Sequence, residues 1–288
     1  MKAWLSDYWW MVLIGIVGAT ILAFVIGSIR MNRVIARETE TLVNSTDKTQ
    51  TEEARTIKKD DLEHLPAPVR RWLENAGVIG HDAIEVMELR QEGTMRLDPE
   101  KTKWMDSTAH QTINVKDPGF IWHVELPMMP LLNVKGRDLF QDGEGGMTIR
   151  VGGLIPIANE KSNDVLNESS LHRFLMEVPW YPTAALEDYM AWEPVDETSA
   201  KGILTYKDMR VEAVFTFDDD GLVRHIEAER YKETDIDAKR IPCIGTIKAH
   251  ETVDGLMVPS EIEITWMLEE GAFTWYRFET KAMRFIDG

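Results

Sequence analysis

The sequence predicts a mainly β fold of the α+β kind: a large curved antiparallel sheet or half-barrel with a few helices on one face, preceded by one transmembrane helix. Three observations lead to this prediction. A long uncharged apolar run lies near the N-terminus, much of the later chain alternates apolar and polar residues, and short turn signals separate the alternating segments. Closely spaced strands of this kind form antiparallel meanders rather than βαβ units.

The composition of the 288-residue chain excludes some classes of function. Lys and Arg number 32 against 49 Asp and Glu, so the formal net charge is −17. A field of this sign repels phosphate backbones, and we expect no nucleic-acid partner. Hydrophobic residues make up 44% of the chain, enough for a sizeable core. The single cysteine, Cys243, excludes an internal disulfide and is interpreted as a small core residue.

Residues 9–29 form the predicted transmembrane helix, after a short N-terminal tail at residues 1–8. The run contains no charged residue, and at 1.5 Å per residue it spans about 31 Å, the thickness of a bilayer core. Trp9 and Trp10 stand at one end as interfacial anchors, and Arg30 follows at the other. A cleaved signal peptide is the alternative, but its apolar stretch is usually shorter. We expect a single-pass anchor in a bacterial inner membrane.

The charges that flank this run favour a cytoplasmic location for the rest of the chain. Arg30, Arg33 and Arg37 follow the run, whereas Lys2, partly offset by Asp7, precedes it. Positive residues are enriched on the cytoplasmic side of a span. The difference is small, and an extracytoplasmic domain stays open as the alternative.

Residues 30–60 are predicted to form a polar stalk, and residues 61–288 a single soluble β-rich domain. The stalk has few large apolar residues and cannot bury a core of its own, although it can continue the membrane helix for some turns. The domain opens with a short helix, in which Pro68 suits the first turn and Gly77 the C-terminal stop.

Strand-like alternation begins after Ile79. Apolar residues recur at every second position in four segments in particular, which are residues 86–97, 120–126, 211–217 and 262–268. Such alternation is typical of strands with one buried and one polar face. With the turn signals between them, about ten strands are expected.

A second helix interrupts the strands directly after Ser169 and Ser170, one of which is expected to cap it, and Pro179 ends it. Arg173 and Glu177 flank its apolar stripe four residues apart. This spacing is typical of an ion pair on a helix surface. The alternative is that both charges border a cavity between helix and sheet and hold the polar head of a ligand.

The arginines Arg224 and Arg230 share the side of a predicted strand with apolar residues. A buried charge needs a partner or a place at a cavity edge. Glu177 is the first candidate partner, and Arg137 with Asp138 could join the same network. A structural ion pair is the competing interpretation.

Other motifs do not indicate a catalytic or metal site. The Gly-rich residues 138–147 are expected to form a hairpin loop rather than a phosphate cradle, and residues 218–221 a turn rather than a calcium loop. The seven histidines are scattered without the spacing of metal-binding motifs. The sequence therefore predicts no cofactor and no metal.

Ten tryptophans are the remaining signal. Most are expected to pack in the core, but wide aromatic side chains on an open sheet also line cavities for apolar ligands. The candidate ligand-binding residues are therefore Trp122, Arg137, Asp138, Arg173, Glu177, Trp180, Trp192, Arg230 and Trp266.

Seven short motifs in this order resemble an uncharacterised bacterial family of unknown function. They are Leu65-Pro-x-Pro-Val-Arg-Arg-Trp-Leu, Gln91-x-Gly-x-Met-Arg96, Phe120-x-Trp122, Gly136-Arg-Asp138, Gly143-x-Gly-Gly-Met147, Arg173-Phe-Leu-Met-Glu177 and Trp180-x-Pro-Thr-Ala184. The resemblance begins near residue 62 and implies no activity, catalytic residue or cofactor. The architecture is similar to the lipoprotein-carrier (LolA-like) fold, a half-barrel around an apolar cavity. That resemblance implies a place outside the cytoplasm, in conflict with the flanking charges.

Three hypotheses for function follow. The first is a membrane-anchored binding protein that holds an apolar or amphiphilic ligand such as a lipid; it predicts that truncating Trp180 lowers ligand occupancy more than stability. The second is an enzyme, which requires Glu177, Asp138 and a histidine to converge in one pocket. The third is an interaction module with a membrane-protein partner, which requires a filled core and an exposed apolar patch. The sequence favours the first hypothesis and leaves catalysis undecided.

Overall fold

The computed structural model describes residues 9–45, 55–129 and 132–287. The predicted tail at residues 1–8 and residues 46–54 of the predicted stalk lie outside these ranges. The helical elements are α2 (Trp9–Asn44), η1 (Lys59–Leu62), α3 (Ala67–Ala76), α4 (Asp164–Glu177), η2 (Val178–Trp180) and η3 (Pro182–Leu186). The strands are β1 (Ile84–Met95), β2 (Met105–Asn114), β3 (Gly119–Met129), β4 (Leu132–Gln141), β5 (Glu144–Val151), β6 (Ile155–Glu160), β7 (Met190–Pro194), β8 (Ser199–Tyr206), β9 (Met209–Phe217), β10 (Val223–Tyr231), β11 (Arg240–Val253), β12 (Leu256–Leu268) and β13 (Gly271–Asp287).

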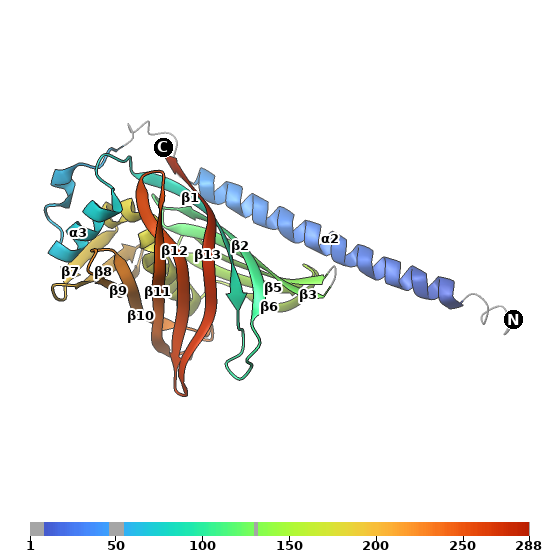
Figure 1. The fold of residues 1–288 in the computed structure, drawn as a ribbon. Coiled ribbons are helices and arrows are strands. Elements are labelled where there is room, and N and C mark those ends of the chain that lie inside the picture. Colours follow the sequence, from blue (N-terminus) through green and yellow to red (C-terminus); the bar gives the residue numbers. More distant parts are fainter. Residues whose placement is uncertain (1–8, 46–54, 130–131, 288) are drawn as a thin grey trace.

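Within the described residues, thirteen strands form one antiparallel sheet in the order β6-β5-β4-β3-β2-β1-β13-β12-β11-β10-β9-β8-β7. The chain builds a first arm outward from β1 to β6, then passes through α4 and returns along a second arm from β7 to β13. The two arms join where β1 pairs with β13, with Met87 opposite Phe285. Figure 1 shows the sheet curving into a half-barrel. The predicted fold class is confirmed, with more strands than the ten expected.

The strands follow the alternation of the sequence. In β9, Val211, Ala213 and Phe215 are buried, whereas the residues between them are exposed or half-buried. The Gly-rich segment forms the β4–β5 hairpin, as predicted. Its two turn residues, Asp142 and Gly143, have φ angles of 55° and 83°, the left-handed values that a two-residue hairpin turn requires.

Helix α3 forms where the sequence predicts a helix. Its C-cap, Gly77, adopts a left-handed φ of 81° and donates its N–H to the carbonyls of Leu73 and Glu74. Trp72, on the buried side of α3, packs against Phe215 and against Trp192, with ring centroids 6.5 and 6.0 Å apart. Helix α3 therefore covers the inner face of the second arm.

Helix α4 lies inside the curve of the sheet, since it contacts β4 and β5 in the first arm and β8, β9 and β10 in the second. The predicted cap at Ser169 or Ser170 is wrong. The helix already begins at Asp164, and the Asn163 side chain caps it by accepting a hydrogen bond of 2.8 Å from the N–H of Leu166. Asparagine caps a helix as well as serine does, so the nearest serine was the wrong choice.

Helix α2 continues past the apolar segment and packs on the outer face of the sheet (Figure 1). Met31, Ile35 and Leu42 recur on one side of the helix and are buried against Ile121 of β3. The Lys135 ammonium donates a hydrogen bond of 3.0 Å to the side-chain oxygen of Asn32, and Arg137 pairs with Glu38.

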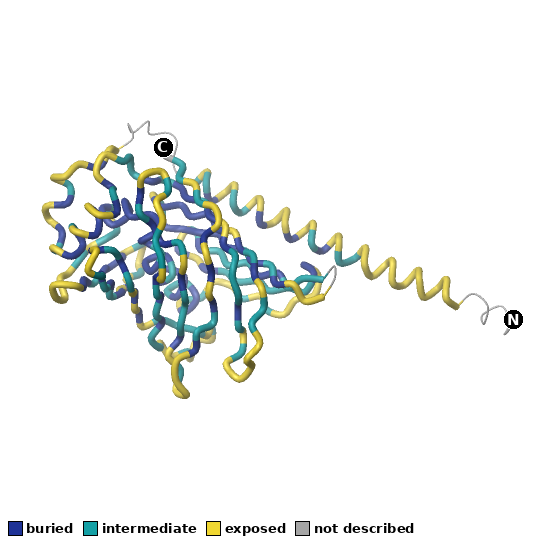
Figure 2. The backbone as a smooth tube through the Cα atoms, viewed as in Figure 1, coloured by how far each residue is buried: buried dark blue, intermediate teal, exposed yellow. Residues whose placement is uncertain are grey.

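Residues 30–44, the first part of the predicted stalk, continue α2 for some turns as expected, and this part of the helix docks on the sheet. Ile57, also within the predicted stalk, is 1% exposed, and its N–H donates to the carbonyl of His81. The apolar residues of this segment are few, but their spacing on one helix side suffices to bury them. Figure 2 shows the contrast with the preceding part of α2, which is largely exposed. Among the described residues, α2 is the one helix long and apolar enough to cross a membrane.

Candidate functional site

A cavity of about 150 Å³ lies between α4, the following turn η2, and the inner face of both arms of the sheet. A cavity of this size can hold a group about as large as benzene. Seven of the nine residues predicted from the sequence line it, namely Trp122, Asp138, Arg173, Glu177, Trp180, Arg230 and Trp266. The hypothesis that Arg173 and Glu177 border a space between helix and sheet therefore agrees with the geometry of the cavity.

One wall of the cavity is an ion-pair network centred on Arg173 of α4. Its guanidinium contacts the Glu177 carboxylate at 2.8 Å and the Asp138 carboxylate of β4 at 3.0 Å. Gln111 of β2 donates a hydrogen bond of 2.6 Å to Glu177. The cation also lies over the rings of Phe120 and Trp122, at 4.8 and 4.9 Å from their centroids. Helix and first arm are therefore joined through one buried cation.

The pKa values in this network reflect burial and the neighbouring charges. Burial raises the pKa of the Asp138 carboxyl above its ordinary value, although Arg173 and Arg230 act in the opposite direction. For Arg173, burial favours the neutral form, but the carboxylates of Glu177 and Asp138 outweigh it and raise the pKa. Arg173 is therefore a permanent cation, and burial favours the protonated form of Asp138.

Arg230 of β10 lies on the same inner face, beside the Cys243 thiol of β11. Its Nε donates to the carbonyl oxygen and the hydroxyl of Ser169, at 3.0 and 3.2 Å. Among the described residues, the guanidinium of Arg230 makes no other hydrogen bond to an oxygen atom. Burial lowers the pKa of Arg230. The Cys243 thiol is also a hydrogen-bond partner of this guanidinium, and the cation lies 5.6 Å from the Trp266 ring centroid.

The opposite wall is apolar and aromatic. Two indole N–H groups of the lining are satisfied by the protein, since Trp122 donates to the Gln91 side chain and Trp180 to the Pro259 carbonyl, both at 3.0 Å. Trp275 differs, because its buried Nε1 has no hydrogen-bond partner among the described residues. The remaining lining is mainly aliphatic and aromatic: Met176, Pro179, Ile226, Ile247, Ile262, Ile264, Tyr276 and Phe278. The cavity is therefore amphipathic, with charges on one side.

Two predicted site residues do not line this cavity. Arg137 lies on the outer face of β4, paired with Glu38 of α2, because adjacent residues of a strand point to opposite faces and Asp138 points inward. Trp192 donates its Nε1 hydrogen to the Ala185 carbonyl at 3.0 Å and packs in the core near α3.

The prediction that Arg224 shares the inner face with Arg230 is wrong. The pairing of β10 with β9 shifts register between Val223 and His225. Val223 is therefore fully buried, and Arg224 is not. Arg224 instead pairs with Asp218 at 3.1 Å. A bulge of this kind reverses the inward and outward positions of a strand.

Several residues that line the cavity or hold its wall residues were not predicted, namely Gln91 and Gly245 of the lining and Gln111 behind Glu177. Gln91 and Gln111 are 1% and 2% exposed. Gln91 accepts the hydrogen bond of the Trp122 indole, and Gln111 donates to the Glu177 carboxylate. Each is a polar residue at an apolar position of its strand, and this is the signal that could have identified them. Gly245 of β11 was also missed, although a glycine inside a strand often marks a close approach or an open space.

His172, next to Arg173 on α4, gives a pH prediction. It is 5% exposed, and burial lowers its pKa from 6.5 to about 4. Because the folded state resists protonation, stability present above pH 6.5 should be lost as the pH falls towards 4, by on the order of 3 kcal/mol. Urea unfolding of the full chain in detergent at pH 7 and 4.5 measures this loss. His172→Gln should reduce it and the exposed-site control His64→Gln should not; an equal pH dependence in both variants would contradict the assignment.

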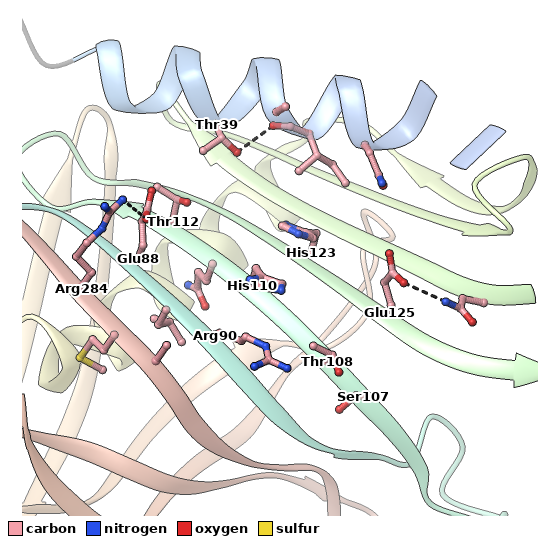
Figure 3. A pocket seen from close by; sticks show the side chains of 18 of the residues that line it. Thr39, Glu88, Arg90, Ser107, Thr108, His110, Thr112, His123, Glu125 and Arg284 are labelled. Atoms are coloured by element: carbon pink, nitrogen blue, oxygen red, sulfur yellow. Dashed lines mark hydrogen bonds and ion pairs between the residues drawn. The ribbon is translucent and has the colours of Figure 1, made fainter. Parts of the chain in front are cut away.

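A second, larger hollow of about 1140 Å³ lies on the outer side of the sheet, beneath α2. Figure 3 shows Thr39 of α2 facing His110 and His123, which come from neighbouring strands. The two imidazole rings are stacked with centroids 5.3 Å apart, and burial lowers the pKa of His123 to about 4. The hollow is open, most of the residues that line it are of polar type, and none of the nine predicted residues is among them.

Within the described ranges, no group of three or more His, Cys, Asp or Glu side chains is placed to hold a metal ion. The inner cavity is lined by two carboxylates, but arginines occupy the positions beside them. The cavity thus combines an apolar lining with charged side chains at one end.

Comparison with known proteins identifies a family and two distant structural neighbours. Residues 63–285 match a family described as a family of unknown function, DUF6920. Among solved structures, a LolA superfamily protein from Nitrosomonas europaea is similar, with 10% identity, a TM-score of 0.42, and coverage of 76% of this chain and 94% of that chain. A beta-barrel-like protein of a domain of unknown function, DUF1849, from Brucella abortus has 8% identity, a TM-score of 0.23, and coverage of 71% and 99%. No curated protein matches the chain.

Proposed function

We propose that this chain, which belongs to the family of unknown function DUF6920, is a membrane-anchored binding protein for an amphiphilic ligand. The observation that carries the proposal is the inner cavity, in which one side is aromatic and aliphatic and the other holds Arg173, Arg230, Asp138 and Glu177. Ligand pockets commonly combine an apolar lining with a few convergent polar groups.

The ligand class follows from the cation and the hydrogen-bond donor that no carboxylate of the cavity satisfies. Arg173 is paired with two carboxylates, whereas Arg230 contacts Ser169 and Cys243 and forms no ion pair among the described residues, and the indole N–H of Trp275 has no partner there. They suit a head group that accepts hydrogen bonds, such as a carboxylate or a phosphate ester. The apolar part of the ligand would lie against the aromatic wall. Since the volume is about 150 Å³, the cavity encloses a small amphiphile or part of a lipid.

The membrane anchor is the second part of the proposal. The first 21 residues of α2 are uncharged and largely exposed, and a helix of this length and composition suits a bilayer. The exposed Arg30, Arg33 and Arg37 follow it and favour a domain on the cytoplasmic side of a bacterial inner membrane. The anchor would keep the cavity close to a source of amphiphiles.

The two alternative hypotheses receive less support. A catalytic centre at Glu177 and Asp138 requires a histidine in reach, and the histidines of the described chain do not line the cavity. An interaction module requires a filled core, whereas a cavity lies between helix and sheet. The binding hypothesis uses both the cavity and the charges around it.

Gly245 offers a direct test by filling the cavity. A Cβ at this position would lie 3.9 Å from the Ile264 side chain and 4.0 Å from that of Met176, which is ordinary contact. Gly245→Ala should therefore bind like the unchanged protein. In Gly245→Phe the ring occupies the cavity, since a space of this size holds about one benzene, and binding should fall at least about tenfold, a loss of 1.4 kcal/mol.

The measurement uses the full chain in nanodiscs with a photoreactive diazirine fatty acid. Cross-linked peptides, identified by mass spectrometry, should come from η2 and from β11 to β13. Circular dichroism confirms that both variants are folded. Equal labelling of the Ala and Phe variants, or labelling confined to α2, would contradict binding in the cavity.

A further inference from the structure

Two segments without any charged residue meet at one end of the first arm. They are residues 126–134, of which 126–129 and 132–134 are described, and residues 151–158, in a chain of which 28% is charged. The first covers the end of β3 and the start of β4, and the second joins β5 to β6. Pairing brings them together, because the N–H of Gly152 donates to the carbonyl of Asn133 at 2.7 Å.

Large apolar side chains point into solvent at this end of the sheet. The exposed fractions are 62% for Met128, 57% for Met129, 40% for Leu154, 51% for Ile155 and 60% for Ile157. Single exposed apolar residues are common, but a group of this size usually marks a contact surface. We call these five residues the hairpin-end patch.

The hairpin-end patch lies beside the apolar half of α2 (Figure 1). The contact is close at the backbone. A Cβ on Gly27 would lie 2.8 Å from the Leu154 Cβ, and a Cβ on Gly153 would lie 2.8 Å from the Gly27 carbonyl oxygen. Glycine at both positions is therefore required for the β5–β6 turn to approach the helix, and the patch is held at the level of residues 24–28 by the packing itself.

This level can be compared with the bilayer. Gly27 lies three positions before Arg30, the first charged residue after the apolar segment. Phe24, which borders Gly152, lies six positions before Arg30. At 1.5 Å per residue, the contacts lie about 5–9 Å on the apolar side of Arg30. Interfacial elements typically enter the headgroup and acyl boundary by about 5–10 Å. The two depths agree.

We propose that the hairpin-end patch inserts into the leaflet from which α2 emerges, so that the lipid bilayer is the partner of this surface. The proposal rests on the anchoring role of α2 in the proposed function. Insertion buries the five apolar side chains, while Arg30 and Arg33 remain at the headgroup level. The absence of charge in both segments removes the repulsion that an acidic domain would otherwise meet at an anionic surface. The half-barrel is thereby fixed against the membrane at two places.

The test measures the depth of single positions in the membrane. The full chain is reconstituted in vesicles of phosphatidylcholine and phosphatidylglycerol, with a fluorescent NBD label on Ile155→Cys or Met128→Cys. Native Cys243 is fully buried and should not react. Lipids that carry a nitroxide near the headgroup quench labels at the interface. Ile236→Cys, at a residue 83% exposed between β10 and β11, is the matched control outside the patch, and Ile14→Cys reports the span.

The expected result is quenching at Ile155→Cys and Met128→Cys, with blue-shifted emission, and none at Ile236→Cys. If the patch labels behave like Ile236→Cys while a nitroxide deep in the acyl chains quenches Ile14→Cys, insertion of the patch is refuted and the anchor stands. If Ile14→Cys also escapes quenching, the anchor fails, and the insertion proposal fails with it.

Discussion

Replacing Arg173 by methionine is expected to lower the free energy of unfolding by about 3–5 kcal/mol, because it leaves two carboxylates in the protein interior without their cation. Arg173 is the shared partner of Asp138 and Glu177, and it also connects α4 to the inner face of β2 and β4. Loss of this cation should therefore loosen the helix from the first arm as well as destabilise the chain.

Equilibrium unfolding in urea measures this loss. The matched control is Arg284→Met, because Arg284 pairs with Glu88 at 2.6 Å but is 66% exposed, and pairs of this kind contribute about 0–1 kcal/mol. A second variant, Arg173→Met with Glu177→Gln and Asp138→Asn, should recover much of the stability, since no buried charge is left unpaired. A loss for Arg173→Met no larger than for the control would show that the carboxylates find other partners.

Trp180→Ala is expected to cost about 3–5 kcal/mol as well, the usual result of removing a large buried aromatic side chain. Trp180 is 5% exposed, its ring packs 5.8 Å from that of Phe278, and its Nε1 donates to Pro259. Trp180→Phe keeps the ring contact and loses the hydrogen bond, so about 1 kcal/mol is expected for this control. A loss below about 1 kcal/mol for Trp180→Ala would indicate that the ring is not part of the core.

This expectation changes the choice of residue for binding experiments. The sequence predicts that truncating Trp180 affects occupancy more than stability, whereas in the structure the same ring forms the cavity wall and packs in the core. A loss of ligand by Trp180→Ala would therefore be hard to separate from unfolding. Gly245 avoids the problem, because a side chain can be added there without removing any contact.

The fold could be predicted because its signals are local. Alternation in residues such as Val211, Ala213 and Phe215 marks a strand regardless of its neighbours, and Gly77 marks a helix end through its left-handed φ. The order of the strands in the sheet has no such local signal in the sequence. Nothing local in β1 indicates that it pairs with β13, because that register depends on residues almost 200 positions away.

Site residues could be predicted where a charged residue stands beside apolar positions of its strand or helix. Arg230 stands on the apolar side of its strand, and Arg173 flanks the apolar stripe of a helix; both line the cavity. The prediction that Arg137 joins Asp138 in one network is wrong, because the alternation of a strand sends the two side chains to opposite faces. Arg224 was misplaced by a register shift, which a regular pattern of two cannot reveal.

The seam between β1 and β13 has a consequence for the biosynthesis of the chain. Among the thirteen described strands, the partner of β1 is the one made last, so the middle of the sheet stays open until β13 has been synthesised. Contacts over such a separation form slowly, because a long loop must close first. Meanwhile β1 exposes an unpaired edge to other nascent chains. A premature stop before β13 would not remove an edge strand. It would remove the strand that joins the two arms, and the sheet would be divided at its centre into two halves with four free edges.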